Sequence, residues 1–259
     1  MPATDHLRYV ALGDSQTEGL GDGDDTVGLR GFADRFAEHL AAAHPGLLYA
    51  NLAVRGRTAA QVRTGQLAPA LELRPDLATV VAGVNDLLRP RFEAARVAGE
   101  LEDMFAALTA TGARVVTVTF PDVTRLVPLA RPLGSRVVAL NDHIRAAAAR
   151  HGVLVCETGR EAVSTDPRLW APDRLHASPL GHARIAAALA RTLDLPGSDD
   201  TWSSPLPPRP ARTPVQAVAA ELGWAAGFLG PWLGRRLRGT SSGDGRTAKR
   251  PALLPLTAA

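Results

Sequence analysis

Short apolar runs alternate with longer amphipathic segments over the first 195 residues of the chain. The runs are rich in Val, Leu and Ala, which is typical of buried strands. They predict strands at Tyr9–Leu12, Leu47–Val54, Leu77–Ala82, Val115–Phe120 and Val153–Cys156. Apolar residues at three- and four-residue spacing predict helices at Gly31–Ala43, Ala59–Leu73, Phe92–Thr111, Arg136–Arg150 and Pro179–Leu193.

Strands separated by single helices indicate βαβ units, in which helices cover both faces of a parallel sheet. Because such crossovers are right-handed, the pattern predicts an α/β fold, a three-layer α/β/α sandwich with a five-stranded parallel sheet. Residues 1–195 form this predicted domain. Ligands of such folds bind beyond the carboxyl ends of the strands, so we expect the chemistry there.

The composition changes after Leu195. Residues 196–212 are rich in Pro and Ser, which is typical of an extended linker. Thr213–Gln216 has a capping-box pattern with Pro at the first helical position, which predicts a helix running to about Leu229. Residues 213–259 are therefore expected to form a helical and basic tail that packs on the domain or is mobile in part.

Charge and cysteine content narrow the class of protein. The 29 Lys and Arg and 26 Asp and Glu give a net charge of +3. Eight basic and four acidic residues lie from Asp199 onward, so the preceding 198 residues hold 21 and 22 and carry −1. This nearly neutral body argues against nucleic acid as a partner. With one cysteine and no Cys/His cluster, we expect no disulfide within the chain, no metal and no organic cofactor.

The N-terminus lacks the basic region and apolar stretch of a signal peptide, and no apolar run is long enough to predict a spanning helix. We therefore expect a cytoplasmic protein, and the preference for Arg over Lys suggests a GC-rich bacterial genome.

The tail combines Trp224, Phe228 and Trp232 with Arg235–Arg238, a composition that also occurs in membrane-surface helices. Because Gly230-Pro231 interrupts it, packing on the domain is favoured over membrane contact.

Polar and glycine residues follow four of the five predicted strands. They are, in chain order, Asp14 and Ser15, Gly56, Asn85 and Asp86, and Asp173 and His176. The carboxyl ends of parallel strands meet at one edge of a sheet, so we expect these residues to converge.

The residue types fit acyl transfer. Ser15 is the candidate nucleophile, because a serine hydroxyl attacks when a neighbouring imidazole takes its proton. His176 is the candidate base, and Asp173 lies close enough in sequence to hold the imidazole tautomer. The backbone N–H groups of Ser15 and Gly56 and the side-chain amide of Asn85 are candidate oxyanion-hole donors.

Other polar residues near these positions receive structural interpretations. We expect Asp14 and Asp86 to support the loops that carry Ser15 and Asn85 through local hydrogen bonds. His182, which follows soon after His176, is interpreted as a packing histidine rather than the base. The loop Gly13–Asp25 is too acidic for a phosphate, which argues against a flavin- or nucleotide-binding protein.

Four sequence blocks together resemble the SGNH (GDSL-type) hydrolases. These blocks are GDS at 13–15, NLAVRG at 51–56, GVND at 83–86 and DRLH at 173–176. The resemblance spans residues 8 to about 195 and implies a flavodoxin-like sandwich, a triad of Ser15, His176 and Asp173, and an oxyanion hole from Ser15, Gly56 and Asn85. One departure is Gln16, which stands where the GDSL signature has Leu.

The sequence therefore predicts a serine esterase that cleaves a small-molecule acyl ester through an acyl-enzyme. The same triad serves a thioesterase or a carbohydrate O-deacetylase equally well. A non-catalytic binding module is disfavoured, because every residue of the triad and the hole is present. The pattern carries no indication of the oligomeric state.

Overall fold

The central sheet has one more strand than predicted. The computed structural model describes residues 6–209, 213–231, 234 and 241–256. In these residues a six-stranded sheet has the order β7-β6-β5-β1-β4-β8. Its strands are β1 (Arg8–Gly13), β4 (Leu48–Asn51), β5 (Leu77–Val81), β6 (Arg114–Val118), β7 (Leu154–Cys156) and β8 (Arg250–Pro255). The first five are mutually parallel, as predicted.

The prediction of five strands is corrected by β8, which comes from the tail and pairs antiparallel with β4. Its sequence, RPALLP, carries a proline near each end, and proline is tolerated in a strand only at a sheet edge. When the five parallel strands are numbered as they occur in the chain, their order across the sheet is 2-1-3-4-5, which is the flavodoxin-like order. The direction of strand addition reverses between β1 and β5, and this places the expected ligand site at their carboxyl ends.

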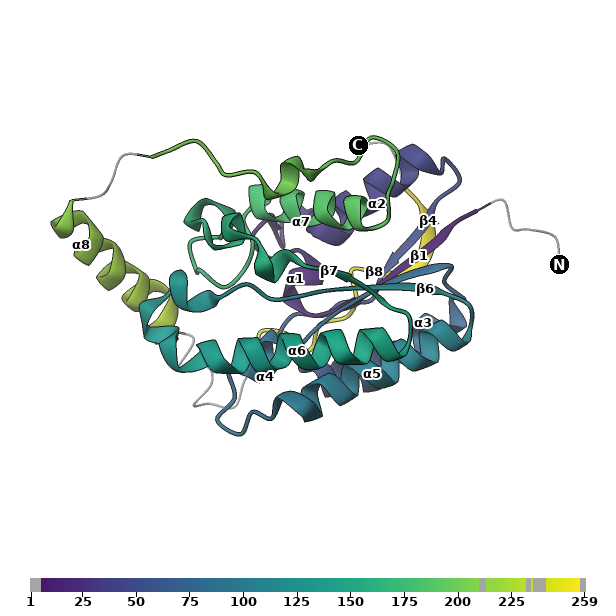
Figure 1. The fold of residues 1–259 in the computed structure, drawn as a ribbon, viewed down its shortest axis with the longest axis horizontal. Coiled ribbons are helices and arrows are strands. Elements are labelled where there is room, and N and C mark those ends of the chain that lie inside the picture. Colours follow the sequence, from purple (N-terminus) through teal and green to yellow (C-terminus); the bar gives the residue numbers. More distant parts are fainter. Residues whose placement is uncertain (1–5, 210–212, 232–233, 235–240, 257–259) are drawn as a thin grey trace.

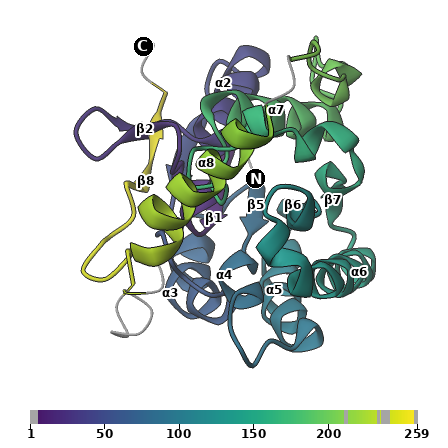
Figure 2. The same ribbon diagram turned by 90° about the vertical axis from the view of Figure 1, so that its left-hand side faces the viewer.

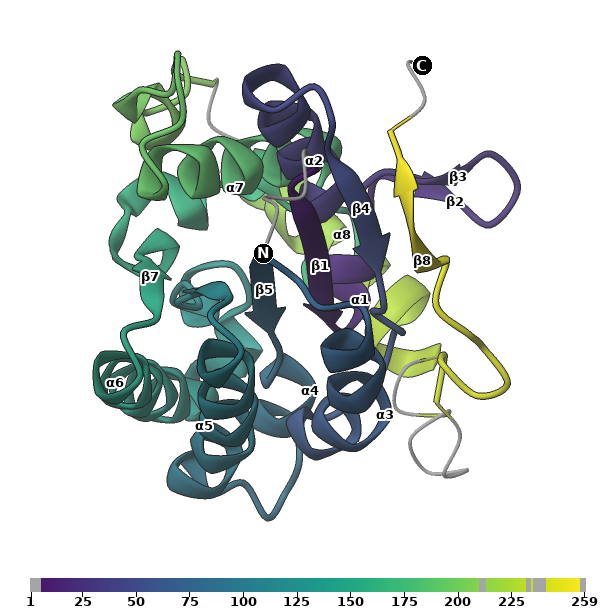
Figure 3. The same cartoon turned by 90° about the vertical axis from the view of Figure 1, so that its right-hand side faces the viewer.

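Helices cover both faces of the sheet (Figure 3). Helices α2 (Phe32–Ala43) and α7 (Pro179–Thr192) pack together on one face. On the other face lie α3 (Ala59–Glu72), α5 (Ala94–Ala110) and α6 (Gly134–Arg150). The predicted three-layer sandwich is thus confirmed.

Shorter elements lie between the main ones. They are α1 (Ser15–Glu18), β2 (Gly23–Asp24), β3 (Gly28–Leu29), α4 (Val84–Leu87) and 3-10 turns at Val123–Arg125, Pro128–Leu133, Thr158–Arg160, Ala162–Thr165, Pro167–Leu169 and Asp200–Ser203. The last turn lies within the predicted linker, and its Trp202 packs against the core. The division of the chain at Leu195 stays a prediction.

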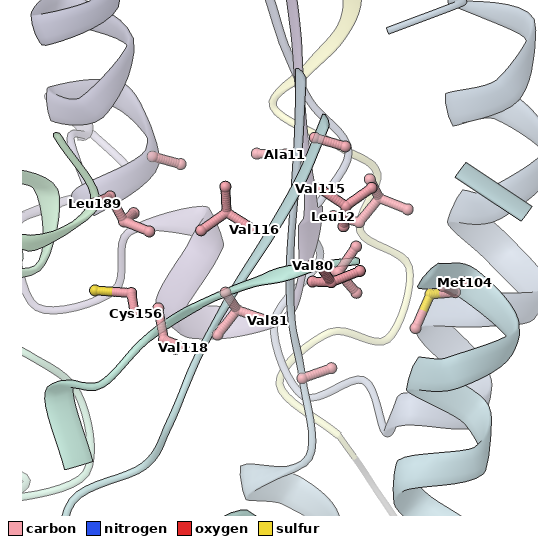
Figure 4. Packing of buried hydrophobic residues seen from close by; sticks show 14 of the residues in the cluster. Ala11, Leu12, Val80, Val81, Met104, Val115, Val116, Val118, Cys156 and Leu189 are labelled. Atoms are coloured by element: carbon pink, nitrogen blue, oxygen red, sulfur yellow. The ribbon is translucent and has the colours of Figure 1, made fainter. Parts of the chain in front are cut away.

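The core lies on both sides of the central strands (Figure 4). Leu12 of β1 and Val80 of β5 are buried, and Met104 of α5 packs against the same cluster. Burying each such side chain contributes about 1.5–3 kcal/mol. The Tyr9 ring stacks on Tyr49 at 5.1 Å. This packing makes β1 a rigid base for the loop that follows it.

The tail returns to the end of the molecule where the strands finish. Helix α8 (Pro214–Trp224) continues as a π-helical turn, Ala225–Leu229. Figure 1 shows α8 at that end, and Figure 2 looks onto it, with α8 crossing in front of β1. Among the described residues, no helix has the length and apolar character needed to cross a membrane.

Candidate active site

The turn between β1 and α1 presents Ser15 at the carboxyl end of the sheet. Asp14 caps α1, and its Oδ1 accepts the Gln16 N–H at 3.2 Å. A Cβ on Gly13 would lie 2.2 Å from Thr17 Oγ1 and 2.5 Å from the Val81 carbonyl oxygen. Glycine at position 13 is therefore a steric requirement of the turn that carries Ser15.

Ser15, His176 and Asp173 form a continuous hydrogen-bonded series. Ser15 Oγ lies 2.9 Å from His176 Nε2, and His176 Nδ1 lies 2.6 Å from Asp173 Oδ2. Asp173 Oδ1 also accepts the backbone N–H groups of Leu175 and His176, each at 3.0 Å. With the Nδ1 proton donated to Asp173, Nε2 is left as an acceptor for the Ser15 hydroxyl.

The acid of this series is held in its ionised form. Burial acts to raise the pKa of Asp173, but the hydrogen bond and charge of His176 outweigh it, and the pKa lies below its ordinary value. An ionised carboxylate at this position can accept the Nδ1 proton and hold the imidazole in one tautomer.

Gln16 clamps the loop that carries His176. Its amide Nε2 donates to the Leu175 carbonyl at 2.8 Å, and its Oε1 accepts the Ala177 N–H at 3.2 Å. These two bonds flank His176 on both sides. A leucine at position 16, as in the GDSL signature, would make neither bond.

Asn85 lies in α4, which follows β5, and Gly56 lies on the loop that follows β4. Asn85 Nδ2 donates to Asp14 Oδ2 at 3.1 Å and to the Arg57 carbonyl at 3.0 Å, so it joins the turn that carries Ser15 to the Gly56 loop. Gly56 has a φ of 77°, a left-handed conformation that favours glycine. The expected convergence of these segments is thus present in the structure.

Asp14 and Asp86 make the hydrogen bonds expected of supporting residues. Asp86 Oδ2 accepts the Ala59 N–H at the start of α3, at 2.9 Å. Burial raises the pKa of Asp14 to about 7, although the Gln16 N–H and the charge of His176 partly offset it. Burial also raises the pKa of Asp86. Both carboxyls therefore tie loops together in a poorly solvated environment.

His182 is a packing residue, as interpreted. It is fully buried, its Nδ1 accepts the Phe32 N–H at 3.0 Å, and its Nε2 donates to the Leu20 carbonyl at 2.9 Å. Burial lowers the pKa of His182 to about 4. A neutral ring with both nitrogens occupied by the backbone is not available as a base.

Further side chains that the sequence analysis did not single out support the site. The Gln66 amide pairs with both backbone groups of Gly13, at 2.8 Å each. Trp224 of α8 donates from its indole N–H to the Asp173 carbonyl at 3.0 Å. Arg174 lies over the Trp224 ring at 5.0 Å and pairs with Glu221 at 2.8 Å. Hydrophobic periodicity carries no signal for such contacts between distant polar groups.

The part of the chain that the structure describes holds no cluster of three or more His, Cys, Asp or Glu side chains arranged to bind a metal ion. Cys156 is buried in β7, and burial raises its pKa to about 11. A thiol in this state is a poor nucleophile.

Solved structures with this fold include enzymes named as lipases and esterases. A lipase/acylhydrolase from Enterococcus faecalis has a TM-score of 0.59 and 22% identity, covering 72% of this chain and 95% of its own. The acetylxylan esterase Axe2 from Geobacillus stearothermophilus has a TM-score of 0.58 and 18% identity, covering 72% and 94%. TesA has a TM-score of 0.61 and 22% identity, covering 72% and 98%. At these identities the likeness establishes the fold.

The sequence itself establishes the family. No curated protein gives a significant match to the chain. The model of the GDSL-like lipase/acylhydrolase family matches residues 11–184, which include Ser15, Gly56, Asn85, Asp173 and His176. The chain therefore belongs to the GDSL-like lipase/acylhydrolase family and is a hydrolase that acts on ester bonds.

Proposed function

We propose that this protein cleaves carboxylic esters through a covalent acyl-enzyme on Ser15. The observation that carries the proposal is the hydrogen-bonded series from Ser15 Oγ through His176 to Asp173, with links of 2.9 and 2.6 Å. A serine hydroxyl placed against an imidazole acceptor, with a carboxylate behind it, is the arrangement that activates a serine nucleophile.

The proposed reaction has two halves. His176 Nε2 takes the Ser15 proton as Oγ attacks the acyl carbon, and the protonated imidazole then donates that proton to the departing alcohol. Water, deprotonated by His176, attacks the acyl-enzyme, and the proton returns to Ser15 as the acid leaves. Asp173 stabilises the imidazolium in both halves.

The oxyanion of each tetrahedral intermediate needs fixed donors. We assign this role to the backbone N–H groups of Ser15 and Gly56 and to Asn85 Nδ2. Both hydrogens of the Asn85 amide have acceptors in the structure, Asp14 and the Arg57 carbonyl. In the proposed mechanism Asn85 exchanges its bond to Arg57 for one to the oxyanion and keeps Asp14 as its anchor.

The substrate is proposed to be a small-molecule acyl ester. Solved structures of this fold include an acetylxylan esterase and a lipase/acylhydrolase. Thioesters and O-acetyl sugars would pass through the same steps, so a substrate panel has to cover esters, thioesters and O-acetyl sugars.

We also propose that the protein is cytoplasmic and has no nucleic-acid partner. Cell fractionation tests the location, and a DNA-binding assay tests the absence of nucleic-acid binding.

The first test is incubation with a fluorophosphonate probe, followed by peptide mass spectrometry. We expect stoichiometric labelling at Ser15 and hydrolysis of p-nitrophenyl acetate. Ser15→Ala should lose both while keeping its fold, whereas Ser164→Ala, in the loop between β7 and α7, should keep both. A folded wild-type protein that neither labels nor hydrolyses esters would contradict the proposal and favour a binding module.

A further inference from the structure

A buried ion pair joins the nucleophile helix to the loop before Gly56. Glu18, the last residue of α1, is 5% exposed, and Arg55 is 8% exposed. The Glu18 carboxylate accepts the backbone N–H of Arg55 at 2.6 Å and its guanidinium at 2.9 and 2.6 Å. One carboxylate thus fixes both the main chain and the side chain of the residue next to Gly56.

The pair continues outward to the C-terminal segment. The other side of the Arg55 guanidinium binds Asp25 at 2.8 Å, and Asp25 binds Arg246 at 2.6 Å. The hydrogen bonds from Arg246 and Arg55, together with their charges, hold the pKa of Asp25 below its ordinary value. The result is a series of four alternating charges, Glu18, Arg55, Asp25 and Arg246, which runs from the nucleophile helix to the tail.

The same tail segment lies directly against the backbone of this loop. A Cβ on Gly56 would fall 2.3 Å from Ser241 Oγ, and a Cβ on Gly243 would fall 1.9 Å from the Arg55 carbonyl oxygen. Glycine at both positions permits this close approach of two main chains. The loop is therefore held by Glu18 on one side and by residues 241–246 on the other.

We propose that the Glu18–Arg55–Asp25–Arg246 series positions the N–H of Gly56 as an oxyanion donor. Glu18, Asp25 and Arg246 are positioning residues, and residues 241–246 of the tail support the active site from outside. This inference rests on the proposed esterase function and on the assignment of Gly56 to the oxyanion hole.

The physical reason is that an oxyanion donor acts only when it is fixed before charge develops. The Arg55 carbonyl and the Gly56 N–H belong to one planar peptide unit, and Gly243 packs against that carbonyl, so holding Arg55 in place restricts the direction of the Gly56 N–H. The buried pair costs desolvation energy, and replacing it with apolar residues is often neutral or stabilising for a fold. Its placement next to Gly56 therefore points to a role in the reaction.

The test uses substitutions in the full-length chain. Arg246→Gln and Asp25→Asn remove exposed members of the series and should lower kcat for p-nitrophenyl acetate about threefold to tenfold, with KM within twofold. Glu18→Gln should lower kcat about 100-fold, since a misplacement of about 1 Å costs this much. Arg246→Lys, which keeps the charge, should restore most of the rate.

Lys249→Gln is the matched control. Lys249 lies three residues beyond Arg246, and its ammonium group binds Asp34 at 2.6 Å and the Leu29 carbonyl rather than a member of the charge series. Its loss should therefore leave kcat unchanged. Affinity for a trifluoromethyl ketone, whose adduct carries an oxyanion, should fall by the same factor as kcat in each variant. The pH at which activity is half-maximal should not move, because His176 is untouched.

Two outcomes would overturn the inference. In the first, Arg246→Gln and Lys249→Gln lower kcat equally, which indicates general docking of the tail. In the second, kcat and ketone affinity are unchanged in folded Arg246→Gln and Asp25→Asn. Failure of the proposed function looks different, because the wild-type protein would then show neither fluorophosphonate labelling nor ester turnover.

Discussion

Replacing Asp173 with Asn tests the role proposed for this residue in the Ser15–His176–Asp173 triad, and the structure fixes how the new amide must lie. Asp173 Oδ1 accepts two backbone N–H groups, from Leu175 and His176. An asparagine keeps these bonds only if its carbonyl oxygen occupies the Oδ1 position. Its NH2 group then faces His176 Nδ1 and donates to it, which forces the imidazole proton onto Nε2. Nε2 can no longer accept the Ser15 proton.

The expected loss is large because the wrong tautomer blocks the first proton transfer. An aspartate-to-asparagine change of this kind costs about 10⁴-fold in kcat in a Ser-His-Asp enzyme, or about 5.4 kcal/mol at 1.36 kcal/mol per decade. The Asp173 side chain is 28% exposed, so water can solvate part of the site and relieve some of this loss. We therefore expect kcat to fall by about 10³- to 10⁴-fold with little change in KM.

The measurement is steady-state hydrolysis of p-nitrophenyl acetate, with circular dichroism to show that the variant is folded. Asp166→Asn is the matched control, because Asp166 lies in the same loop region and also accepts a backbone N–H two residues ahead, that of Arg168. Its kcat should stay within twofold of wild type. A folded Asp173→Asn variant with more than a tenth of the wild-type kcat would refute the tautomer argument.

Four further substitutions test single positions. Because burial raises the pKa of Asp14 to about 7, the folded state binds its proton more tightly than the unfolded state. The free energy of unfolding of wild type relative to Asp14→Asn should then fall by roughly 4 kcal/mol between about pH 4 and pH 7 in urea titrations, and a constant difference would contradict this. Gln16→Leu removes both hydrogen bonds that flank His176 and should lower kcat about tenfold in the same ester assay, whereas an unchanged kcat would show that the clamp is dispensable. Gly152→Ala, at a φ of 64° with open space around it, should cost about 1 kcal/mol in denaturant unfolding. Gly56→Ala, which also meets Ser241, should cost more and lower kcat at least 100-fold; equal effects would contradict the steric argument.

Most of the sheet could be predicted, because buried parallel strands appear in a sequence as short runs of apolar residues. The end of β4 was not. The prediction extends it to Val54, but β4 ends at Asn51. The buried Asn51 amide donates to the Thr17 carbonyl, and its Oδ1 accepts the Ala53 N–H, so the chain turns away although Leu52–Val54 is apolar. Burial in a loop and burial in a strand give the same sequence signal.

The convergence of Ser15, Asn85 and His176 could be predicted because parallel strands bring their carboxyl ends to one edge. Their catalytic roles stay proposals. The clamp by Gln16 could not be predicted, because its partners lie about 160 positions away in the sequence and no periodicity links them. The same holds for the Glu18–Arg55 pair, whose members are separated by 37 positions.

The tail shows why a composition argument alone cannot decide what a segment does. The sequence left two interpretations, packing on the domain and contact with a membrane, and the structure shows that the tail's two parts dock differently. Residues 241–256 are held by the β8 ladder and by the Arg246 and Lys249 ion pairs. Helix α8 is held to the His176 loop by the Trp224 hydrogen bond and the Arg174–Glu221 pair, and contacts of these kinds are worth about 1 kcal/mol or less each. Its apolar residues Val215, Val218 and Leu222 stay exposed. The positioning role is assigned to Arg246 rather than to α8 because the segment that carries Arg246 lies against the Gly56 loop.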